Sequence, residues 1–273
     1  MRFEILTIFP EFFDTPFAHG VLGRAVSDGV VEIKVQDLRA YAADKRGTVD
    51  DRPFGGGEGM VLKPEPILAA ASAMGITEKA KRNVKRETVV LLSAQGRPFT
   101  QAVARELAGL ERVTLVCGRY EGVDERVNEM LCDRELSIGD YVLSGGELAA
   151  AVVVDAVVRL LPRVLGNADS NRYESFGVGD AELADEEKTA DGVPRAVHGA
   201  GGMLDYPHYT RPAEFEGQAV PEALMGGDHA AIRKWRREAA LRKTWRNRPE
   251  LLERAELTRG ERELVEKWKR GGE

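Results

Sequence analysis

The sequence contains little cysteine and no long apolar run. Its only cysteines, Cys117 and Cys132, form no CxxC pair and do not have the spacing of a zinc site. We therefore expect two buried, reduced thiols, as in a cytosolic protein, and no metal site. The apolar segment 3–9 is too short for a secretion signal, and no apolar run approaches membrane-spanning length. These absences predict a soluble, cytoplasmic protein.

The chain also lacks an excess of positive charge. It carries 39 Lys and Arg against 45 Asp and Glu, which gives a formal net charge of -6. This balance argues against a uniformly basic surface for nucleic acid but allows a local basic patch. At 273 residues with 43% hydrophobic content, the chain is long enough for one large domain or two smaller ones, and we expect two.

Apolar runs predict a mostly parallel α/β sheet in the N-terminal part. The run 3–9 is closed by Pro10 and is typical of a strand buried on both faces. Further strands are expected at 30–38, 88–92 and 113–117, with a turn at 93–98, and helices are expected at 21–28, 64–74, after a cap at Thr100, and at 146–161. The order strand, glycine loop, helix, strand is typical of a parallel sheet.

The most distinctive stretch is 117–147, which holds two glycine-bearing loops, 118–122 and 138–147. The first loop follows the apolar run 113–117, so it lies where a buried strand ends. Ligands of open α/β sheets bind beyond the carboxyl ends of strands, where glycine allows the backbone to come close. A lone Gly-Gly pair would indicate only a tight turn, but two such loops can clamp one ligand.

A third glycine-rich segment, 46–60, is predicted to be a loop. It does not match the P-loop, which needs Lys and then Ser or Thr after its last glycine. It also fails the dinucleotide fingerprint, which needs a glycine where Met60 stands. We interpret the segment as a mobile loop that lets the backbone approach a flat ligand or a nucleotide.

The composition changes after residue 163. Residues 164–203 are rich in Gly, Asp, Glu and Ala and have few large apolar side chains, so we expect a flexible acidic linker. Residues 204–273 are expected to form a small α-helical domain. Within it, Asp228 can cap a helix that ends before Pro249.

This helix carries one acidic residue, Glu238, among many basic ones. The basic residues are Arg233, Lys234, Arg236, Arg237, Arg242, Lys243, Arg246 and Arg248. One sign of charge on a helix of an acidic protein favours a polyanion partner over a solvated surface. Ile232, Trp235 and Ala239 share one face, which is more typical of core packing than of base stacking.

The stretch 117–147 resembles the bacterial tRNA (guanine-N1)-methyltransferases. The resemblance extends to the motifs Phe9-Pro10-Glu11, 48–57, 208–212 and 248–252, and covers most of the chain except 175–203. It implies methylation of N1 of the guanosine at position 37 of tRNA, 3′ of the anticodon, with S-adenosyl-L-methionine as methyl donor and with Mg²⁺ as an optional ion. It also implies a homodimer whose active site uses both subunits.

The resemblance further implies the domain layout. Residues 1–163 would be a SPOUT-like catalytic domain with a deep trefoil knot through 89–165, followed by the linker and by a tRNA-binding domain at 204–273. The hydrophobic pattern does not indicate a knot, and threaded chains are rare in general.

The resemblance assigns the cofactor-binding residues, and the charge of the helix that Asp228 caps indicates the tRNA-binding ones. S-adenosylmethionine would be bound by Leu92, Gly118, Arg119, Tyr120, Glu121, Ile138, Gly139, Asp140, Tyr141, Val142, Leu143, Gly145 and Gly146. The tRNA would be contacted by Arg233, Arg236, Arg237, Arg242 and Arg246.

The catalytic arginine of the family corresponds to Arg159, which could instead pair with Asp155 at i,i+4. The family's catalytic aspartate has no equivalent, since the chain reads Glu174-Ser175-Phe176 at that motif. Glu174 would then be the general base, and Asp169 is the alternative. Two other functions stay open from the residues alone: an RNA-binding protein with an inactive site, and a phosphate-loop enzyme.

Overall fold

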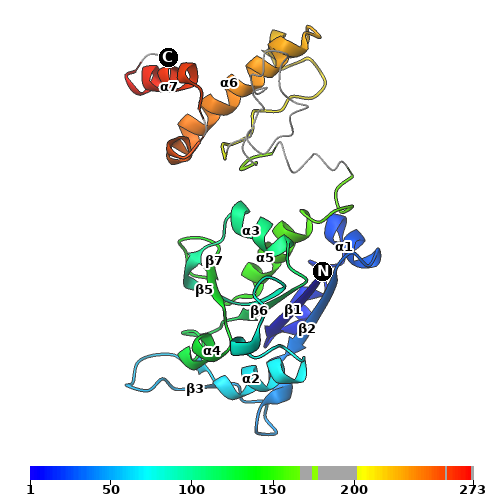
Figure 1. Cartoon of the computed structure of the whole chain (residues 1–273), viewed down its shortest axis with the longest axis vertical. Helices are drawn as coiled ribbons and strands as arrows, with labels where there is room; N and C mark the ends of the chain where they lie inside the picture. The colour runs from blue at the N-terminus through cyan, green and yellow to red at the C-terminus, as the bar shows by residue number, and fades with distance from the viewer. Residues whose placement is uncertain (167–173, 178–201, 256, 272–273) are drawn as a thin grey trace. The chain divides into compact units, whose positions relative to one another are not determined.

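The computed structural model describes residues 1–166, 174–177, 202–255 and 257–271 (Figure 1). The chain divides into two compact units, Met1–Gly166 and Asn167–Glu273, which we call unit 1 and unit 2. In the part of the chain that is described, no helix is both long enough and apolar enough to cross a membrane.

Unit 1 is built on a five-stranded sheet in the order β2-β1-β6-β5-β7, and all neighbouring strands are parallel (Figure 1). The strands are β1 (Arg2–Thr7), β2 (Glu32–Asp37), β5 (Glu87–Pro98), β6 (Arg112–Cys117) and β7 (Arg134–Ser137). The predicted mostly parallel α/β sheet is confirmed. β1 and β6 are buried along most of their length and β5 is buried from Thr88 to Leu92, which explains the apolar runs of these segments.

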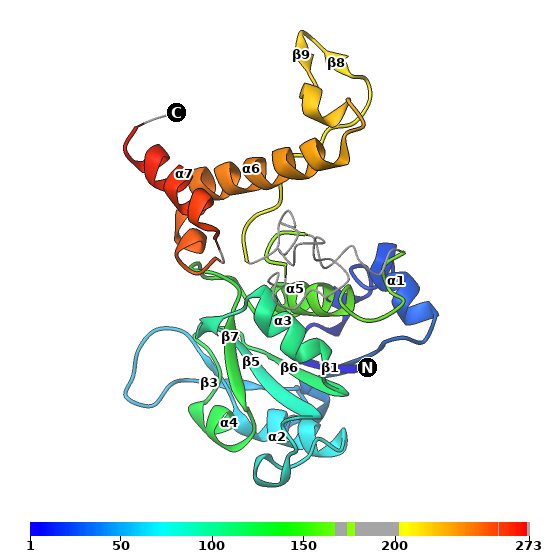
Figure 2. The ribbon, with the colours of Figure 1, turned by 45° about the horizontal axis from the view of Figure 1, so that its top comes forward.

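Helices cover both faces of this sheet (Figure 2). On one face, α1 (Gly20–Ser27), α3 (Gln101–Ala108) and α5 (Glu147–Val158) pack over a core that includes Phe3 and Leu115. On the other face, α2 (Pro64–Ala73) and α4 (Glu125–Met130) pack over a second core. Short 3-10 turns complete the unit: η1 (Pro10–Phe13), η2 (Leu38–Tyr41) and η3 (Lys79–Lys81). Thr100 caps α3 as predicted, because its side chain accepts a hydrogen bond from Val103 N.

The segment 93–98 differs from its prediction as a turn. β5 pairs with β7 up to Leu92 and again at Arg97 and Pro98, with an irregularity between them. Gly96 lies in this irregularity, and a Cβ there would come within 2.5 Å of the Leu136 backbone nitrogen. The glycine that looked like a turn signal is therefore needed because the β7 backbone passes directly beside it.

Unit 2 is organised around α6 (His229–Asn247) and α7 (Arg259–Lys269). The predicted cap is confirmed, since Asp228 accepts hydrogen bonds from the backbone of Ala230 and Ala231. The unit also contains η6 (Glu222–Leu224), η7 (Pro249–Glu253) and a hairpin of β8 (Glu214–Phe215) and β9 (Gln218–Ala219). Its core consists of Met203, Leu241, Leu252, Val265 and Trp268. Met203, which the composition placed at the end of the linker, is fully buried there.

The buried face of α6 is not the one predicted. Ile232, Trp235 and Ala239 are only half-buried, whereas the buried residues are Arg237, Ala240, Leu241 and Thr244. The apolar periodicity was misleading because a charged residue, Arg237, takes a core position by pairing with Glu261 of α7. The Nε atom of Arg237 donates a hydrogen bond to Glu261 Oε1 at 2.6 Å, and both side chains are largely removed from water.

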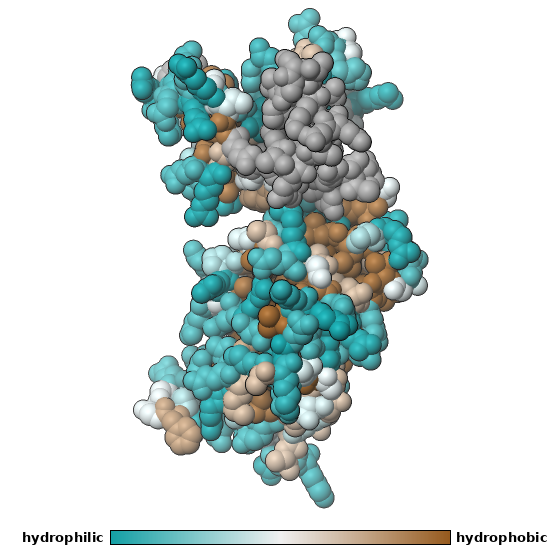
Figure 3. All heavy atoms as spheres, viewed as in Figure 1, coloured by the Kyte–Doolittle hydropathy of each residue, from teal (hydrophilic) through white to brown (hydrophobic). Residues whose placement is uncertain are grey.

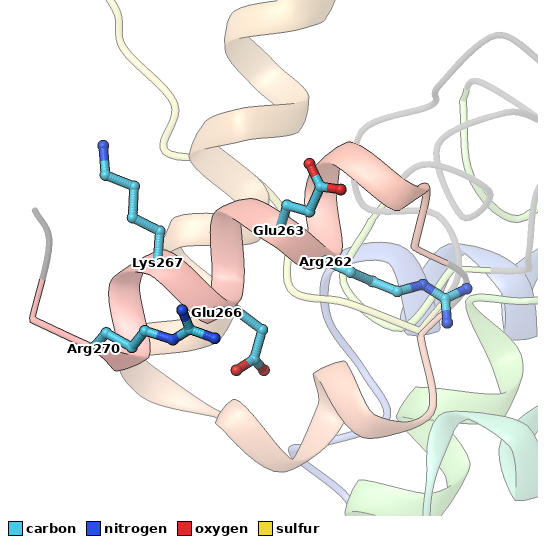
Figure 4. A pocket seen from close by; sticks show the side chains of 5 residues that line it. All are labelled: Arg262, Glu263, Glu266, Lys267 and Arg270. Atoms are coloured by element: carbon cyan, nitrogen blue, oxygen red, sulfur yellow. The ribbon is translucent and has the colours of Figure 1, made fainter.

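α7 differs from α6 in its charge pattern. Its exposed face mixes both signs, with ion pairs between Arg259 and Glu263 and between Lys269 and Glu266. Figure 4 shows the side chains around a shallow hollow on this helix pointing in different directions, and the residues are Arg262, Glu263, Glu266, Lys267 and Arg270. Such a mixed surface is typical of a solvated helix.

We predict that Arg237→Ala lowers the free energy of unfolding of unit 2 by roughly 3 kcal/mol, because it leaves the Glu261 carboxylate without its partner in a mostly buried position. All three tryptophans of the chain lie in unit 2, so tryptophan fluorescence during urea unfolding measures this change. Arg233→Ala, at an exposed position of the same helix, is the control and should change the free energy by less than about 0.5 kcal/mol.

The same pair predicts a pH dependence. Burial alone would raise the pKa of Glu261, but the hydrogen bond and charge of Arg237 outweigh it and lower this pKa below its ordinary value of 4.5. The stabilisation by the pair is therefore present above about pH 4.5 and is lost as the pH falls through the lowered pKa. Arg237→Ala should remove this part of the acid sensitivity, and an unchanged acid sensitivity would contradict the assignment.

Candidate functional site

A cavity of about 420 Å³ opens at the carboxyl ends of β6 and β7 and beside the middle of β5 in unit 1. It is lined by residues 91–95, 118–123, 135–139 and 141–146, together with Glu125 and Ala149. Every residue predicted to bind S-adenosylmethionine lines it except Asp140. The irregular segment 93–95 of β5 also lines the cavity. The sequence did not indicate this role, because the composition of 93–98 is typical of a turn. The cavity lies where open α/β sheets bind their ligands.

The two glycine loops meet directly through their backbones. Gly146 N donates a hydrogen bond to Gly118 O at 2.9 Å. The backbones of Arg119 and Gly145 also form an isolated antiparallel β-bridge. A Cβ on Gly146 would lie 2.7 Å from the Cα of Cys117, closer than non-bonded atoms can approach. Glycine is therefore required where the loop after β7 touches the end of β6.

Each loop also contains an unusual backbone conformation. Tyr120 has a φ of 61°, in the left-handed region that is uncommon for a residue with a side chain. Gly139 has a φ of 154°, and a Cβ there would overlap the ring of Tyr141. The Tyr141 hydroxyl donates a hydrogen bond to Ile138 O at 3.2 Å, so the second loop is folded back on itself. Backbone strain that is held in place by neighbouring contacts is frequent at ligand sites.

Arg119 links the two loops to the rest of the sheet. Its Nη1 atom donates a hydrogen bond to Ser144 O at 2.8 Å, and its Nε atom lies 3.4 Å from Glu147 Oε2. The Glu147 carboxylate is 3% exposed and accepts a hydrogen bond from Thr7 Oγ1 at 2.8 Å. The guanidinium also lies 4.6 Å from the ring centroid of Phe9. Arg119 thus connects the second loop to the buried carboxylate of Glu147 on α5.

Glu147 closes the predicted loop 138–147, but no role was predicted for it or for Thr7. Glu147 is the first residue of α5 and Thr7 is the last residue of β1, so each is unremarkable within its own element. Their contact joins residues 140 positions apart, and only the packing of α5 against the sheet brings them together.

The thiols of the two cysteines, Cys117 at the end of β6 and Cys132, are unreactive. Burial raises the pKa of the Cys117 thiol well above its ordinary value, and the Glu147 carboxylate acts in the same direction. Burial likewise raises the pKa of Cys132 to about 12. Both thiols therefore stay neutral at pH 7, and a neutral thiol is a poor nucleophile.

The glycine-rich segment 46–60 contacts the first glycine loop. The segment was expected to be a loop throughout, but it contains the two-residue strand β3 (Asp50–Asp51), which pairs with β4 (Val61–Leu62) just after the segment. Glu121 N donates to Met60 O at 3.0 Å, and Leu62 N donates to Gly122 O at 3.0 Å. A Cβ on Gly59 would overlap the Glu121 side chain, so this glycine lets the segment pass close to the first glycine loop.

The two predicted catalytic residues belong to different units. Arg159 is half-buried at the end of α5 in unit 1, where its backbone N–H bonds to Asp155 O at 3.2 Å. Glu174 lies in a short turn of unit 2. Asp169, the alternative base, lies outside the described residues.

The turn that carries Glu174 is attached to the segment beginning at Gly202. Phe176 N donates to Met203 O at 2.8 Å, and Asp205 N donates to Ser175 Oγ at 3.0 Å. The turn itself is closed by a hydrogen bond from Gly177 N to Glu174 O at 3.0 Å. The predicted linker therefore contains a motif that is anchored to the helical unit.

The arginines predicted to contact tRNA fall into three groups. Arg233, Arg242 and Arg246 are exposed on α6. Arg236 is half-buried, and its guanidinium lies 4.8 Å from the ring centroid of Tyr206. Arg237 is buried and bound to Glu261, so it is not on the surface where a nucleic acid would meet it.

Within the described ranges, no group of three or more His, Cys, Asp or Glu side chains could hold a metal ion.

Comparison with known proteins identifies the family. Residues 1–254 match the family described as tRNA (Guanine-1)-methyltransferase TrmD. A protein of Koribacter versatilis (strain Ellin345) named tRNA (guanine-N(1)-)-methyltransferase is 53% identical over 272 residues, which is 99% of each chain. Proteins of the same name are 46% identical over all of both chains in Geobacter sulfurreducens and 48% identical over 272 residues, 99% of this chain and 97% of the relative, in Dictyoglomus turgidum. The chain therefore belongs to the tRNA (guanine-1)-methyltransferase family.

Proposed function

We propose that the protein transfers the methyl group of S-adenosylmethionine to N1 of the guanosine at position 37 of tRNA. The observation that carries this proposal is the cavity between two hydrogen-bonded glycine loops at the strand ends, in a chain that matches this methyltransferase family along nearly its whole length. The proposed site for the methyl donor is this cavity.

The residues of the cavity fit such a cofactor. The glycines at 118, 145 and 146 line the cavity without a side chain, so the adenine and amino acid parts can come close to the backbone there. Tyr120 and Tyr141 add aromatic rings, about half exposed, and Glu121 adds a carboxylate to attract a cation. When bound there, S-adenosylmethionine supplies a methyl group carried on a positively charged sulfur.

The chemistry requires removal of a proton from guanine. The lone pair of N1 is tied into the ring amide, so N1 becomes nucleophilic as its proton leaves and negative charge develops towards O6. Glu174 is the proposed base that takes this proton, and Arg159 is the proposed cation that faces the charge on O6. Asp169 remains the alternative base.

The active form is proposed to be a homodimer with an active site formed by both subunits. Apolar side chains that unit 1 exposes support this proposal. On α5, Leu148 and Val152 are 51% and 46% exposed at i,i+4, and Phe12 of η1 is also exposed. Figure 3 shows apolar surface around α1 in this unit. The trefoil knot and the assistance of Mg²⁺ stay predictions of the family resemblance.

The cofactor site can be tested at Gly145. Its Cβ would overlap Arg119 Nε and lie 2.5 Å from Glu147 Oε2, so Gly145→Ala must displace the arginine that holds the second loop. We predict that this change weakens S-adenosylmethionine binding on the order of tenfold or more by calorimetry, about 1.4 kcal/mol per tenfold. Gly166→Ala, where a Cβ has open space, is the matched control and should bind normally. Equal affinities of the two variants would place the cofactor elsewhere.

The base can be tested at Glu174. Glu174→Gln keeps the size of the side chain but cannot accept the proton, so single-turnover methylation of tRNA should fall by roughly 10² to 10⁴. Cofactor and tRNA affinities should stay nearly unchanged. Asp169→Asn should be close to silent, and the reverse result would make Asp169 the base. If both variants keep the full rate, neither carboxylate removes the proton.

The exposed arginines of α6 are proposed to bind phosphates of tRNA. If Arg233 and Arg242 each touch a phosphate, changing both to alanine should lower the slope of log K against log salt by about 1.5, since each contact releases about 0.7 to 0.9 of a counterion. The matched control replaces Arg259 and Arg262 of α7, where basic and acidic residues alternate, and should leave the slope unchanged. Parallel slopes for both double variants would show that the arginines of α6 only solvate the surface.

A further inference from the structure

A second cavity lies wholly within unit 2. Its volume is about 900 Å³, at the upper end of the roughly 300–1,000 Å³ typical of ligand pockets. It is formed by the extended segment 206–211, the two residues that flank the β8–β9 hairpin, η6 and its following residue, and the first turns of α6, and Figure 2 shows the hairpin and α6. Its lining residues outside 206–211 are Ala213, Val220, Leu224, Met225, Ile232 and Arg236. We call it the hairpin groove.

Three aromatic side chains line the hairpin groove, Tyr206, His208 and Tyr209, and Trp235 packs against two of them. The ring centroids of Tyr206 and Trp235 are 6.4 Å apart, and those of Tyr209 and Trp235 are 6.1 Å apart. His208 lies against Tyr206 at 4.5 Å. Tyr209 is 50% exposed, so its ring has a surface that a ligand can cover. The motif 208–212 thus supplies flat, half-exposed rings to a cavity.

The groove is also positively charged. Arg211 and Arg236 line it, and no carboxylate is among its described lining residues. The Nε atom of Arg236 is buried and has no hydrogen-bond partner among the described residues. A buried donor without an acceptor costs about 1–3 kcal/mol, so an acceptor brought by a ligand would be favoured there.

We propose that the hairpin groove binds one unstacked nucleobase of tRNA, with the base against Tyr209 and a phosphate or base carbonyl oxygen on Arg236. Every base has a flat face that stacks on an aromatic ring, and proteins that bind single-stranded nucleic acid combine such rings with positive charge. An acidic peptide would use the arginines but would not need the rings. The inference rests on tRNA as the substrate and adds a base-binding site to the phosphate contacts of α6.

The experiment measures binding of a full-length tRNA transcript by Tyr209→Ala and by Tyr209→Phe. Loss of the ring should raise the Kd on the order of tenfold, whereas Tyr209→Phe keeps the ring and should bind like the parent protein. For methylation by Tyr209→Ala, KM for tRNA should rise while kcat is unchanged. S-adenosylmethionine affinity should not change, and urea unfolding followed by tryptophan fluorescence checks that unit 2 stays folded.

A set of transcripts, each with one unpaired nucleotide made abasic, identifies the base. For one of these transcripts, loss of the base should weaken binding to the parent protein about tenfold compared with intact tRNA. The same transcript and intact tRNA should bind Tyr209→Ala equally well, because the lost base and the lost ring belong to one contact. If Tyr209→Ala binds tRNA as the parent does, or if Tyr209→Phe loses as much as Tyr209→Ala, stacking on Tyr209 is excluded. If every abasic transcript weakens both proteins equally, the groove does not hold a base.

These outcomes are separate from those for the proposed function. Absence of methyl transfer by the parent protein would count against the methyltransferase function, whereas the binding measurements would still decide whether the groove takes a base.

Discussion

The buried carboxylate of Glu147 determines how the proposed cofactor site is arranged. A carboxylate that is 3% exposed must be paired and hydrogen-bonded, because an unpaired buried charge is strongly destabilising. Its two partners, Thr7 and Arg119, come from the ends of β1 and β6. Because Arg119 also bonds to Ser144 O, satisfying the buried charge fixes the first glycine loop, the second loop and the start of α5 together. The shape of the cavity thus follows from an electrostatic requirement in the layer beneath it.

Much of unit 1 could be predicted because its signals are local. A strand buried on both faces needs a continuous apolar run, and β1, β5 and β6 all have one. The helix cap at Thr100, like that at Asp228 in unit 2, needs only a side-chain oxygen beside the first turn. Glycines near strand ends indicated where the backbone comes close to other groups. What the glycines contact could not be read from the sequence.

The predictions that were wrong concern residues whose structure depends on a partner far away in the sequence. The segment 93–98 has the composition of a turn, but β7 pairs with it. β7 itself was not predicted because it has only four residues, with a charged residue at each of its first two positions. In the sequence, Arg237 does not differ from the exposed basic residues beside it. It is buried because it pairs with Glu261, 24 residues later in the chain. Basic residues on one helix can therefore have opposite roles, and a count of charges does not separate them.

The anchoring of the motif around Glu174 constrains how this chain can use a glutamate where the family has an aspartate. The extra methylene moves the carboxylate by up to about 1.5 Å, and misplacing a catalytic group by about 1 Å can cost roughly a hundredfold in rate. A freely moving linker would absorb this displacement by shifting its backbone. Here Ser175 and Phe176 are hydrogen-bonded to Asp205 and Met203, and Met203 is fixed in the core of unit 2. The backbone after Glu174 is therefore held in place, so in the proposed role as base it is the side-chain torsions of Glu174 that would bring its carboxylate to N1 of the guanine.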